Sequence, residues 1–514
     1  MKKTIALLVA TLTFFWGYAQ NSVPNDVALV ISQSGKNGEK LKQVIRHYQK
    51  SNDRRKLDAT YFLIKNLKGH YSQELIWIDC DGKDLKFNEL KYPDMESSVK
   101  AFNQIKRTNH IQDKIVEYQD IDVISTDYII KNIDQAFELW KKPWNAQLSF
   151  EDFCEFLLPY RISLEAFQDW RSVYFNYFKN QYNNIKNEGK KNELCILVNN
   201  QINSQFTDIP ETERAKKQMP LLGPLNILHR LQGDCPDRVN FATYAMRSVG
   251  VPCCTDFTPF WATSSGTHFW NVTLEEGKKP IIFMSGSHSP GTYIIERELG
   301  KVFRITYAEQ KESLAKRAKP SEIPEGFLQT PFIKDVTNEY VLTGDYASKI
   351  RSADFSTGYT WGFAAVFNYS KWKIIDWGEV KNKNNEKYIQ FRNLGVNCIY
   401  LPVFFQNGKT IPAGEPFSID MAGNILERKP DINKTQTIKL NEQDKYLIYR
   451  PGKKYKLFYW DKKWIELGEK TAGTQKYLVF ENVPANAVLL LRPEYSQGKE
   501  RIFTVNNKGQ RTYW

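Results

Sequence analysis

The sequence reads Gly233-Asp234-Cys235-Pro236-Asp237-Arg238 at the point that decides its fold. Proline suits the first turn of a helix, and Gly250 closes the periodic run that follows. Apolar residues recur in that run at three- and four-residue spacing, at Val239, Ala242, Ala245, Met246 and Val249. The pattern predicts a helix that begins at Cys235, with the cysteine at its N-terminus.

A second stretch, Thr267-His268-Phe269-Trp270-Asn271-Val272, follows further along the chain. Its aromatic and β-branched residues favour a strand over residues 269–274. Alternation along that strand puts His268, Trp270, Val272 and Leu274 on one face. If this face meets the predicted helix, the imidazole reaches the thiol. A helix N-terminus and a nearby imidazole together make a thiol nucleophilic, so we expect Cys235 and His268 to act as nucleophile and base.

This order of motifs resembles the transglutaminase-like superfamily of exported bacterial type, a papain-like group in which a cysteine opens a core helix and a histidine follows on the next strand. The resemblance covers roughly residues 221–286. Three elements carry it: Gly233-Asp234-Cys235, Met246-Arg247-Ser248-Val249-Gly250-Val251-Pro252 and Gly266-Thr267-His268-Phe269-Trp270. The tryptophan two residues after the histidine is the most specific feature. The resemblance implies acyl transfer from an amide through a thioester, ending on water or an amine.

One element of the family pattern is absent. The family places an acidic residue on the strand after the histidine, where it orients the imidazole. Here residues 280–286 read Pro-Ile-Ile-Phe-Met-Ser-Gly and contain no carboxylate. Ser285 is the tentative substitute and the side-chain carbonyl of Asn271 the alternative, although on a flat strand Asn271 would face away from His268. The site is therefore expected to be slow, to use a substitute, or to be inactive.

The cysteines leave one structural alternative open. The chain has 7 cysteines, and exported proteins often pair them, so Cys235 could instead form a disulfide with Cys253 or Cys254. Among the 6 histidines, only His268 has a recognisable motif around it.

The first residues have the pattern of a cleaved signal peptide. Lys2 and Lys3 precede an apolar run, and the small residue Ala19 marks a cleavage point. There is no cysteine near that point, so we expect no lipoprotein anchor, and no later apolar run is long enough for a membrane span. These features predict a periplasmic or secreted protein.

Charge and motifs exclude several function classes. The formal net charge of +13 becomes +11 without the two lysines of the signal peptide (13 − 2). The basic residues are spread over short mixed runs, which favours an acidic envelope polymer over nucleic acid as a partner. The sequence has no zinc-ligand pair at metalloprotease spacing, no glycine-rich phosphate loop and no Gly-x-Ser-x-Gly elbow. We therefore expect thiol chemistry with no cofactor and no metal.

Length and pattern predict an α+β multidomain protein. After the signal peptide (residues 1–20), we expect a helical N-terminal domain at 21–148 and a papain/transglutaminase-like α+β core at 149–318. Two tandem all-β, sandwich-like modules are expected at 319–430 and 431–514.

An internal repeat predicts the two modules. Tyr388-Ile389-Gln390-Phe391-Arg392-Asn393-Leu394 matches Tyr477-Leu478-Val479-Phe480-Glu481-Asn482-Val483 at an offset of 89 (477 − 388), and Asn397 matches Asn486 at the same offset. Short alternating runs between turn signals favour antiparallel sheets. Aromatic residues of this region could stack on sugar rings, although burial is the commoner outcome; they are Trp372, Trp377, Tyr459, Trp460 and Trp464.

These observations predict an exported transglutaminase-like cysteine hydrolase, a peptidase or amidase that acts on a peptide or amide-containing substrate. Cys235 would attack the carbonyl, and His268 would activate the thiol and then protonate the leaving amine. Trp270 and Asp234 are candidates for the substrate cleft. The alternative is a catalytically impaired transglutaminase-like scaffold whose β modules bind a polysaccharide, such as a cell-envelope glycan, or a protein partner.

Overall fold

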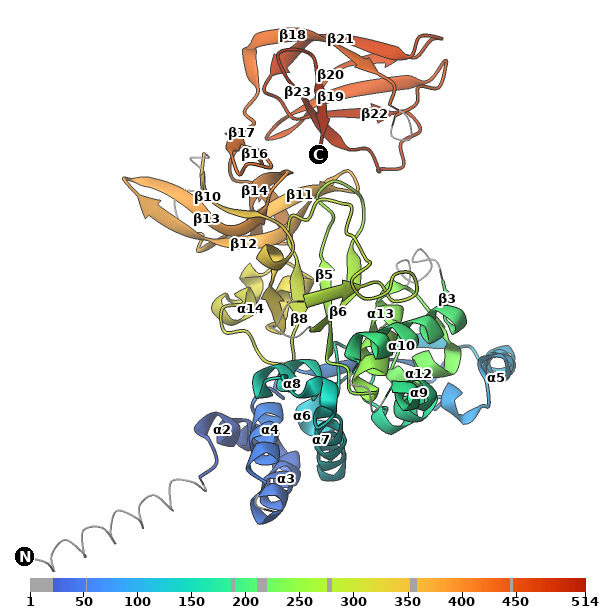
Figure 1. Ribbon diagram of the computed structural model, residues 1–514. Coiled ribbons are helices and arrows are strands. Elements are labelled where there is room, and N and C mark those ends of the chain that lie inside the picture. The colour runs from blue at the N-terminus through green and yellow to red at the C-terminus, as the bar shows by residue number, and fades with distance from the viewer. Residues whose placement is uncertain are drawn as a thin grey trace, which may run out of the picture. The chain divides into compact units, whose positions relative to one another are not determined.

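The computed structural model describes residues 22–51, 53–185, 190–209, 220–274, 280–351, 358–443 and 447–514 (Figure 1). The predicted signal peptide lies outside the described residues. Contacts divide the chain into two compact units. Unit 1 comprises Met1–Thr255, Trp270–Tyr293 and Ile305–Glu309, and unit 2 comprises Asp256–Phe269, Ile294–Arg304 and Gln310–Trp514. The chain mixes helices with several sheets, as the sequence predicts.

Amphipathic helices form the first part of unit 1. They are α2 (Asn25–Gln33), α3 (Gly38–Ser51), α4 (Arg54–Lys65), α6 (Asp120–Val123), α7 (Thr126–Trp140) and α8 (Phe150–Phe156). The apolar stripe of α3, from Leu41 to Tyr48, is buried in a cluster that also includes side chains of α4 and α7. Burial of such stripes stabilises helices that are too short to be stable alone. Within the described residues, no helix is both long and apolar enough to cross a membrane.

An antiparallel strand pair interrupts this helical region, and the sequence periodicity did not predict it. β1 (Tyr71–Ile78) pairs with β2 (Gln112–Gln119), and α5 (Met95–Thr108) lies between them in the chain. Trp77 on β1 contacts the rings of Phe87 and Phe102. Ring contacts between residues that are distant in sequence leave no local pattern, which is why the sequence did not predict this strand pair.

The centre of unit 1 is the helix α13 (Cys235–Ser248), which begins at the predicted residue. Its neighbours are α9 (Arg171–Ile185), α10 (Lys191–Gln205) and α12 (Pro224–Arg230) (Figure 1). Every residue of α13 from Val239 to Ser248 is buried. A short parallel ladder of β3 (Thr207–Asp208) and β4 (Gln232–Gly233) leads into the helix. The residues of α13 that are not fully buried, Cys235, Pro236 and Arg238, therefore all lie in its first turn.

A five-stranded sheet in the order β7-β6-β5-β8-β9 carries the predicted histidine strand. Its strands are β5 (Cys253–Thr258), β6 (His268–Leu274), β7 (Pro280–Phe283), β8 (Phe303–Ile305) and β9 (Ile333–Asp335), and the short helix α14 (Leu314–Arg317) precedes the last of them. The strand expected at 269–274 is confirmed as β6. The division between the two units crosses this sheet, because β5, β6 and β8 contribute residues to both.

The rest of unit 2 is built from strands. An eight-stranded sheet has the order β10-β13-β12-β11-β14-β16-β17, with β15 paired to β14. Its strands are β10 (Thr343–Lys349), β11 (Trp361–Asn368), β12 (Lys371–Lys383), β13 (Glu386–Gly395), β14 (Cys398–Gln406), β15 (Lys409–Pro412), β16 (Phe417–Ile419) and β17 (Ile425–Glu427).

The C-terminal strands form a ladder of β18 with β21 and a sheet in the order β20-β19-β22-β23-β24 (Figure 1). They are β18 (Asp431–Asn441), β19 (Lys454–Asp461), β20 (Lys463–Thr471), β21 (Tyr477–Ala485), β22 (Leu489–Pro493), β23 (Ile502–Val505) and β24 (Arg511–Tyr513). One of the sheets of the protein is curled and sandwich-like.

The repeated segments lie on corresponding strands, β13 and β21. The repeated asparagines share an unusual backbone: φ is 51° at Asn393 and 57° at Asn482, and 58° at Asn397 and 60° at Asn486. Asparagine tolerates this left-handed region better than other side chains. The shared backbone conformation is consistent with the prediction that the two β regions are related modules.

Candidate functional site

The thiol of Cys235 lies at the start of a capped helix. Asp234 is the N-cap of α13: its carboxylate accepts a hydrogen bond from the backbone N–H of Asp237 at 3.3 Å. The Asp237 carboxylate accepts one in return from the backbone N–H of Asp234, also at 3.3 Å. Both aspartates are buried. This reciprocal capping box fixes the residue at which the helix begins and so places Cys235 in its first turn.

Gly233 is required by close packing against this cap. A Cβ at position 233 would lie 2.6 Å from the Cβ of Asp237, which is well inside van der Waals contact. The Gly-Asp-Cys sequence therefore has a structural explanation at its first two residues, because glycine makes room for the cap and aspartate forms it.

Cys235 differs from the interior thiols of the protein. Cys235 is half-buried. Neither it nor Cys253 nor Cys254 forms a disulfide. Burial raises the pKa of the Cys195 thiol well above its usual value and the pKa of Cys398 to about 12. By contrast, the partial positive charge and the N–H groups of a helix N-terminus stabilise a negative charge at the position of Cys235.

His268, the first residue of β6, and its aromatic partner Trp261 both belong to unit 2. Its imidazole stacks on the indole of Trp261, with ring centroids 5.3 Å apart and planes inclined by 26°. The guanidinium of Arg297 lies 5.4 Å from the centroid of the same indole. Burial, with a smaller contribution from Arg297, lowers the pKa of His268 to about 4. The imidazole is therefore neutral at neutral pH, the state in which it can accept a proton.

Asn271 directs its side chain towards α13. Its Nδ2 donates to the carbonyl oxygen of Val239 at 2.9 Å and to Oγ1 of Thr243 at 3.0 Å. Its Oδ1 is buried and has no hydrogen-bond partner within the described parts of the chain. The amide thus ties β6 to the central helix, which is a structural role.

Ser285 follows β7 and is completely buried. Its Oγ has no hydrogen-bond partner among the residues that the structure describes. Its carbonyl oxygen accepts a hydrogen bond of 3.5 Å from Nη1 of Arg238, which lies in the first turn of α13. A buried hydroxyl without a partner costs free energy, and Oδ1 of Asn271 is in the same position, so the structure favours neither of the two predicted substitutes for the missing carboxylate.

The two residues expected to line a substrate cleft are buried, and this expectation needs correction. Trp270 is 0% exposed and Asp234 is 4% exposed. The carboxylate of Asp234 is committed to the helix cap. Trp270 is a core residue, as tryptophan at an interior strand position commonly is.

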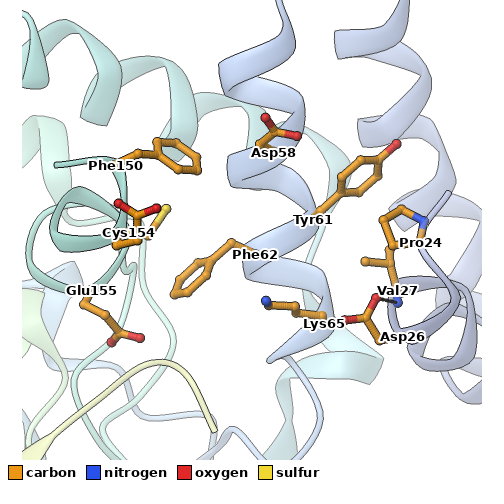
Figure 2. A pocket seen from close by; sticks show the side chains of 11 residues that line it. Pro24, Asp26, Val27, Asp58, Tyr61, Phe62, Lys65, Phe150, Cys154 and Glu155 are labelled. Carbon is orange, nitrogen blue, oxygen red and sulfur yellow. Dashed lines mark hydrogen bonds between the residues drawn. The ribbon is translucent and has the colours of Figure 1, made fainter. Parts of the chain in front are cut away.

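Unit 1 also has a cavity of about 400 Å³ between α2, α4 and α8, which the sequence did not predict (Figure 2). Cys154 and Glu155 lie on one wall, and Phe62 lies on another. Glu155 accepts hydrogen bonds from the backbone N–H groups of Tyr307 at 2.9 Å and Ala308 at 3.1 Å. Burial is the main cause that raises the pKa of the Cys154 thiol. Cys154 is therefore not an activated thiol.

A second cavity, of about 600 Å³, lies in unit 2 and has apolar walls. Thr267 and Phe269, on either side of His268 in the sequence, line it together with Phe257 and Phe327. Because side chains alternate along a strand, Thr267 and Phe269 face away from the side of the imidazole. We assign this cavity no part in the chemistry of His268.

The tryptophans of the β region pack against one another. Trp372 contacts Trp460, and Trp460 contacts Trp464, with ring centroids 5.5 and 5.1 Å apart. Trp377 contacts Trp361 in the same apolar cluster. Trp460 is buried and has a core role, whereas Trp372, Trp377 and Trp464 are half-buried and Trp372 also lines the second cavity.

The described residues contain no group of three or more His, Cys, Asp or Glu side chains placed to hold a metal ion. In comparisons with known proteins, no family model and no curated protein matches the chain. Among solved structures, the transglutaminase of red sea bream is similar to it, with 10% sequence identity, 86% of this chain and 76% of that chain covered, and a TM-score of 0.19. At this TM-score the similarity carries no argument about function.

Proposed function

We propose that this protein is an exported transglutaminase-like cysteine hydrolase that cleaves amide bonds of a peptide or amide-containing substrate through a thioester. The observation that carries the proposal is the position of Cys235, a half-buried thiol in the first turn of a helix whose start is fixed by a capping box. The sequence order of cysteine helix and histidine strand supports it. The proposal includes a periplasmic or secreted location. It also includes the division of the chain into a signal peptide, a helical domain, a transglutaminase-like core and two β modules.

In the proposed reaction, the sulfur of Cys235 attacks the amide carbonyl carbon while its proton passes to the neutral imidazole of His268. Backbone N–H groups at the start of α13 would stabilise the oxyanion that forms. The imidazolium then gives its proton to the leaving amine as the C–N bond breaks. Water hydrolyses the resulting thioester by the reverse proton transfers, which releases the acid and restores the thiol.

The low pKa of His268, about 4, favours this sequence over a permanent ion pair. An imidazole of that pKa remains uncharged over the physiological range, so it acts as a base only when the thiol attacks. The orienting group is proposed to be the hydroxyl of Ser285, with the side-chain carbonyl of Asn271 as the alternative, since Oγ of Ser285 and Oδ1 of Asn271 both lack a hydrogen-bond partner among the described residues.

The impaired scaffold is the second candidate, and one observation favours it: residues 280–286 contain no acidic orienter. In that case the β modules would bind a polysaccharide or a protein partner, and the core would serve as a rigid platform. The tryptophan packing in unit 2 lends no support to the polysaccharide version.

The rate of iodoacetamide labelling between pH 5 and 9 tests the proposal, read for each cysteine by peptide mass spectrometry. The exposed Cys80 is an internal reference in the same sample. We expect Cys235 to be labelled faster than Cys80 below pH 7, and the rate at Cys235 to fall about tenfold or more in His268→Ala. The variant His110→Ala, which removes an exposed histidine, is the matched control. Equal rates at both cysteines in all three proteins would favour the scaffold.

A further inference from the structure

We infer that Asn368 and Arg501, two residues of the C-terminal β region, are positioning residues for His268. They hold the loop of residues 258–267, which carries Trp261 and leads directly into His268. This inference rests on the proposed function, in which His268 is the base. It gives the β region a role in the site that does not require a glycan.

Asn368 is the last residue of β11 and is completely buried. Its Oδ1 accepts a hydrogen bond from the backbone N–H of Gly266 at 3.0 Å. Its Nδ2 lies 3.1 Å from the carbonyl oxygen of Trp261, 2.9 Å from that of Ser264 and 3.1 Å from that of Gly266. A single amide therefore forms hydrogen bonds with backbone groups at three points of the loop.

Arg501 holds the same loop from a second side. Its guanidinium donates to the carbonyl oxygens of Ala262 and of Ser264, the latter at 3.1 Å, and also to that of Phe367 at the end of β11. Its Nε donates to the oxygen of Trp514 at 2.9 Å. Desolvation lowers the pKa of Arg501 to about 10. Arg501 is half-buried, so these oxygens replace hydrogen bonds that its guanidinium would otherwise make with water.

Packing and local hydrogen bonds also constrain the loop: Ala262 is buried in an apolar cluster of the β region, and Phe260 packs against that cluster. The N–H of Trp261 donates to the carbonyl oxygen of Gly266 at 3.0 Å, and Oγ1 of Thr267 donates to the carbonyl oxygen of Thr258 at 2.8 Å. Gly266 has a φ of 93°, a conformation that suits glycine. These bonds close the loop on itself, whereas Asn368 and Arg501 attach it to the β region. In this inference, both attachments help to hold Trp261 in its stacked position on His268.

The titration of His268 is the readout that distinguishes positioning from general stability. It is followed by NMR of the ring resonances in protein labelled at histidine, with His268→Gln to assign the signal. We expect an apparent pKa near 4 in the wild type and a rise of about one pH unit or more in Asn368→Ala and in Arg501→Ala, because a loosened loop exposes the imidazole to water. Arg501→Lys keeps the charge but not the planar fork, and should also show a raised value.

Asn486→Ala is the matched control. Nδ2 of Asn486 donates to the carbonyl oxygens of Glu427 at 2.9 Å and Lys429 at 3.1 Å, in the same unit but outside the loop. This variant should lower the melting temperature and leave the His268 titration unchanged. An unchanged titration in both Asn368→Ala and Arg501→Ala, together with lower melting temperatures, would overturn the inference. If either variant fails to fold, Asn368→Ser and Arg501→Lys provide the same comparison with a smaller loss of contacts.

The labelling of Cys235 in the same proteins separates this inference from the proposed function. If wild-type labelling does not depend on His268, the proposed hydrolase fails, but the titration still decides whether the two residues position the imidazole. If labelling depends on His268, Asn368→Ala should lower the rate at Cys235 below pH 7 while the rate at Cys80 stays the same.

Discussion

The imidazole of His268 lies over the indole of Trp261, with ring centroids 5.3 Å apart and planes inclined by 26°. Stacking of this kind removes water from one face of the imidazole, and loss of hydration disfavours its charged form. The electrostatic effect of Arg297 acts in the same direction. The aromatic partner and the nearby cation together keep the predicted base uncharged.

The first prediction concerns the pH dependence of this histidine. In Trp261→Ala, the pKa of His268 should rise from about 4 towards its ordinary value, because water reaches the exposed ring face. In Arg297→Ala it should rise less, since desolvation is the larger cause. The NMR titration measures both changes.

Trp261→Phe is the control for this experiment, because it keeps an aromatic ring over the imidazole. Its titration should stay closer to the wild type than that of Trp261→Ala. If the pKa of His268 changes more in Arg297→Ala than in Trp261→Ala, the charge of Arg297 and not burial is the main cause of the low pKa.

The second prediction concerns the start of α13. In Gly233→Ala, the new Cβ would meet the Cβ of Asp237 at 2.6 Å, so the capping box must shift. We expect a loss of roughly 1–3 kcal/mol in the free energy of unfolding and slower labelling of Cys235. Gly344→Ala is the control, because its Cβ would meet only atoms of Ile419 at 4.0 Å. Comparable losses in both variants would contradict the proposed role of Gly233.

The third prediction compares two buried polar side chains. Asn271→Ala removes one donor from the carbonyl oxygen of Val239 and one from Oγ1 of Thr243, and we expect it to cost about 0.5–1.5 kcal/mol. Ser285→Ala removes a hydroxyl that has no partner among the described residues, so it should be neutral within about 0.5 kcal/mol or stabilising. Chemical denaturation measures both.

The same pair of variants tests the orienting role. If Ser285 orients His268, Ser285→Ala should slow the labelling of Cys235 below pH 7 even though its stability is unchanged. Normal labelling in Ser285→Ala would remove this residue from the site.

The fourth prediction concerns stability in acid. His70 is buried, stacks on Tyr307 with ring centroids 4.5 Å apart, and its Nε2 lies 2.9 Å from the carbonyl oxygen of that residue. Desolvation lowers the pKa of His70 to about 3. The unfolded chain therefore binds the proton first as the pH falls, and the stability present above pH 6.5 is lost between about pH 6.5 and 3.

His70→Gln should reduce this loss by up to about 1.4 kcal/mol per pH unit within that window. Melting temperatures measured from pH 7 to pH 4 provide the test. His110→Gln removes an exposed histidine and should leave the slope unchanged. Parallel slopes in wild type and His70→Gln would show that His70 is protonated in the folded protein.

Local patterns in the sequence predicted the elements that carry the candidate residues. Pro236 and the periodic apolar residues after it specified the helix that begins at Cys235, because helix start signals and periodicity are properties of neighbouring residues. Aromatic and β-branched content specified β6 in the same way. The internal repeat was visible for the same reason, since its strands and turns are encoded segment by segment.

The tertiary structure decided what surrounds those residues. It buried Trp270 and turned Asp234 into a helix cap, so neither lines a cleft. It also brought Asn368 to Gly266, which lies 102 residues earlier, and Arg501 to Ala262, which lies 239 residues earlier. These contacts end on backbone N–H and C=O groups, which every residue but proline carries alike, so no sequence motif marks them. The sequence alone determined which elements hold the thiol and the imidazole, whereas only folding decided that distant side chains would fix the loop before His268.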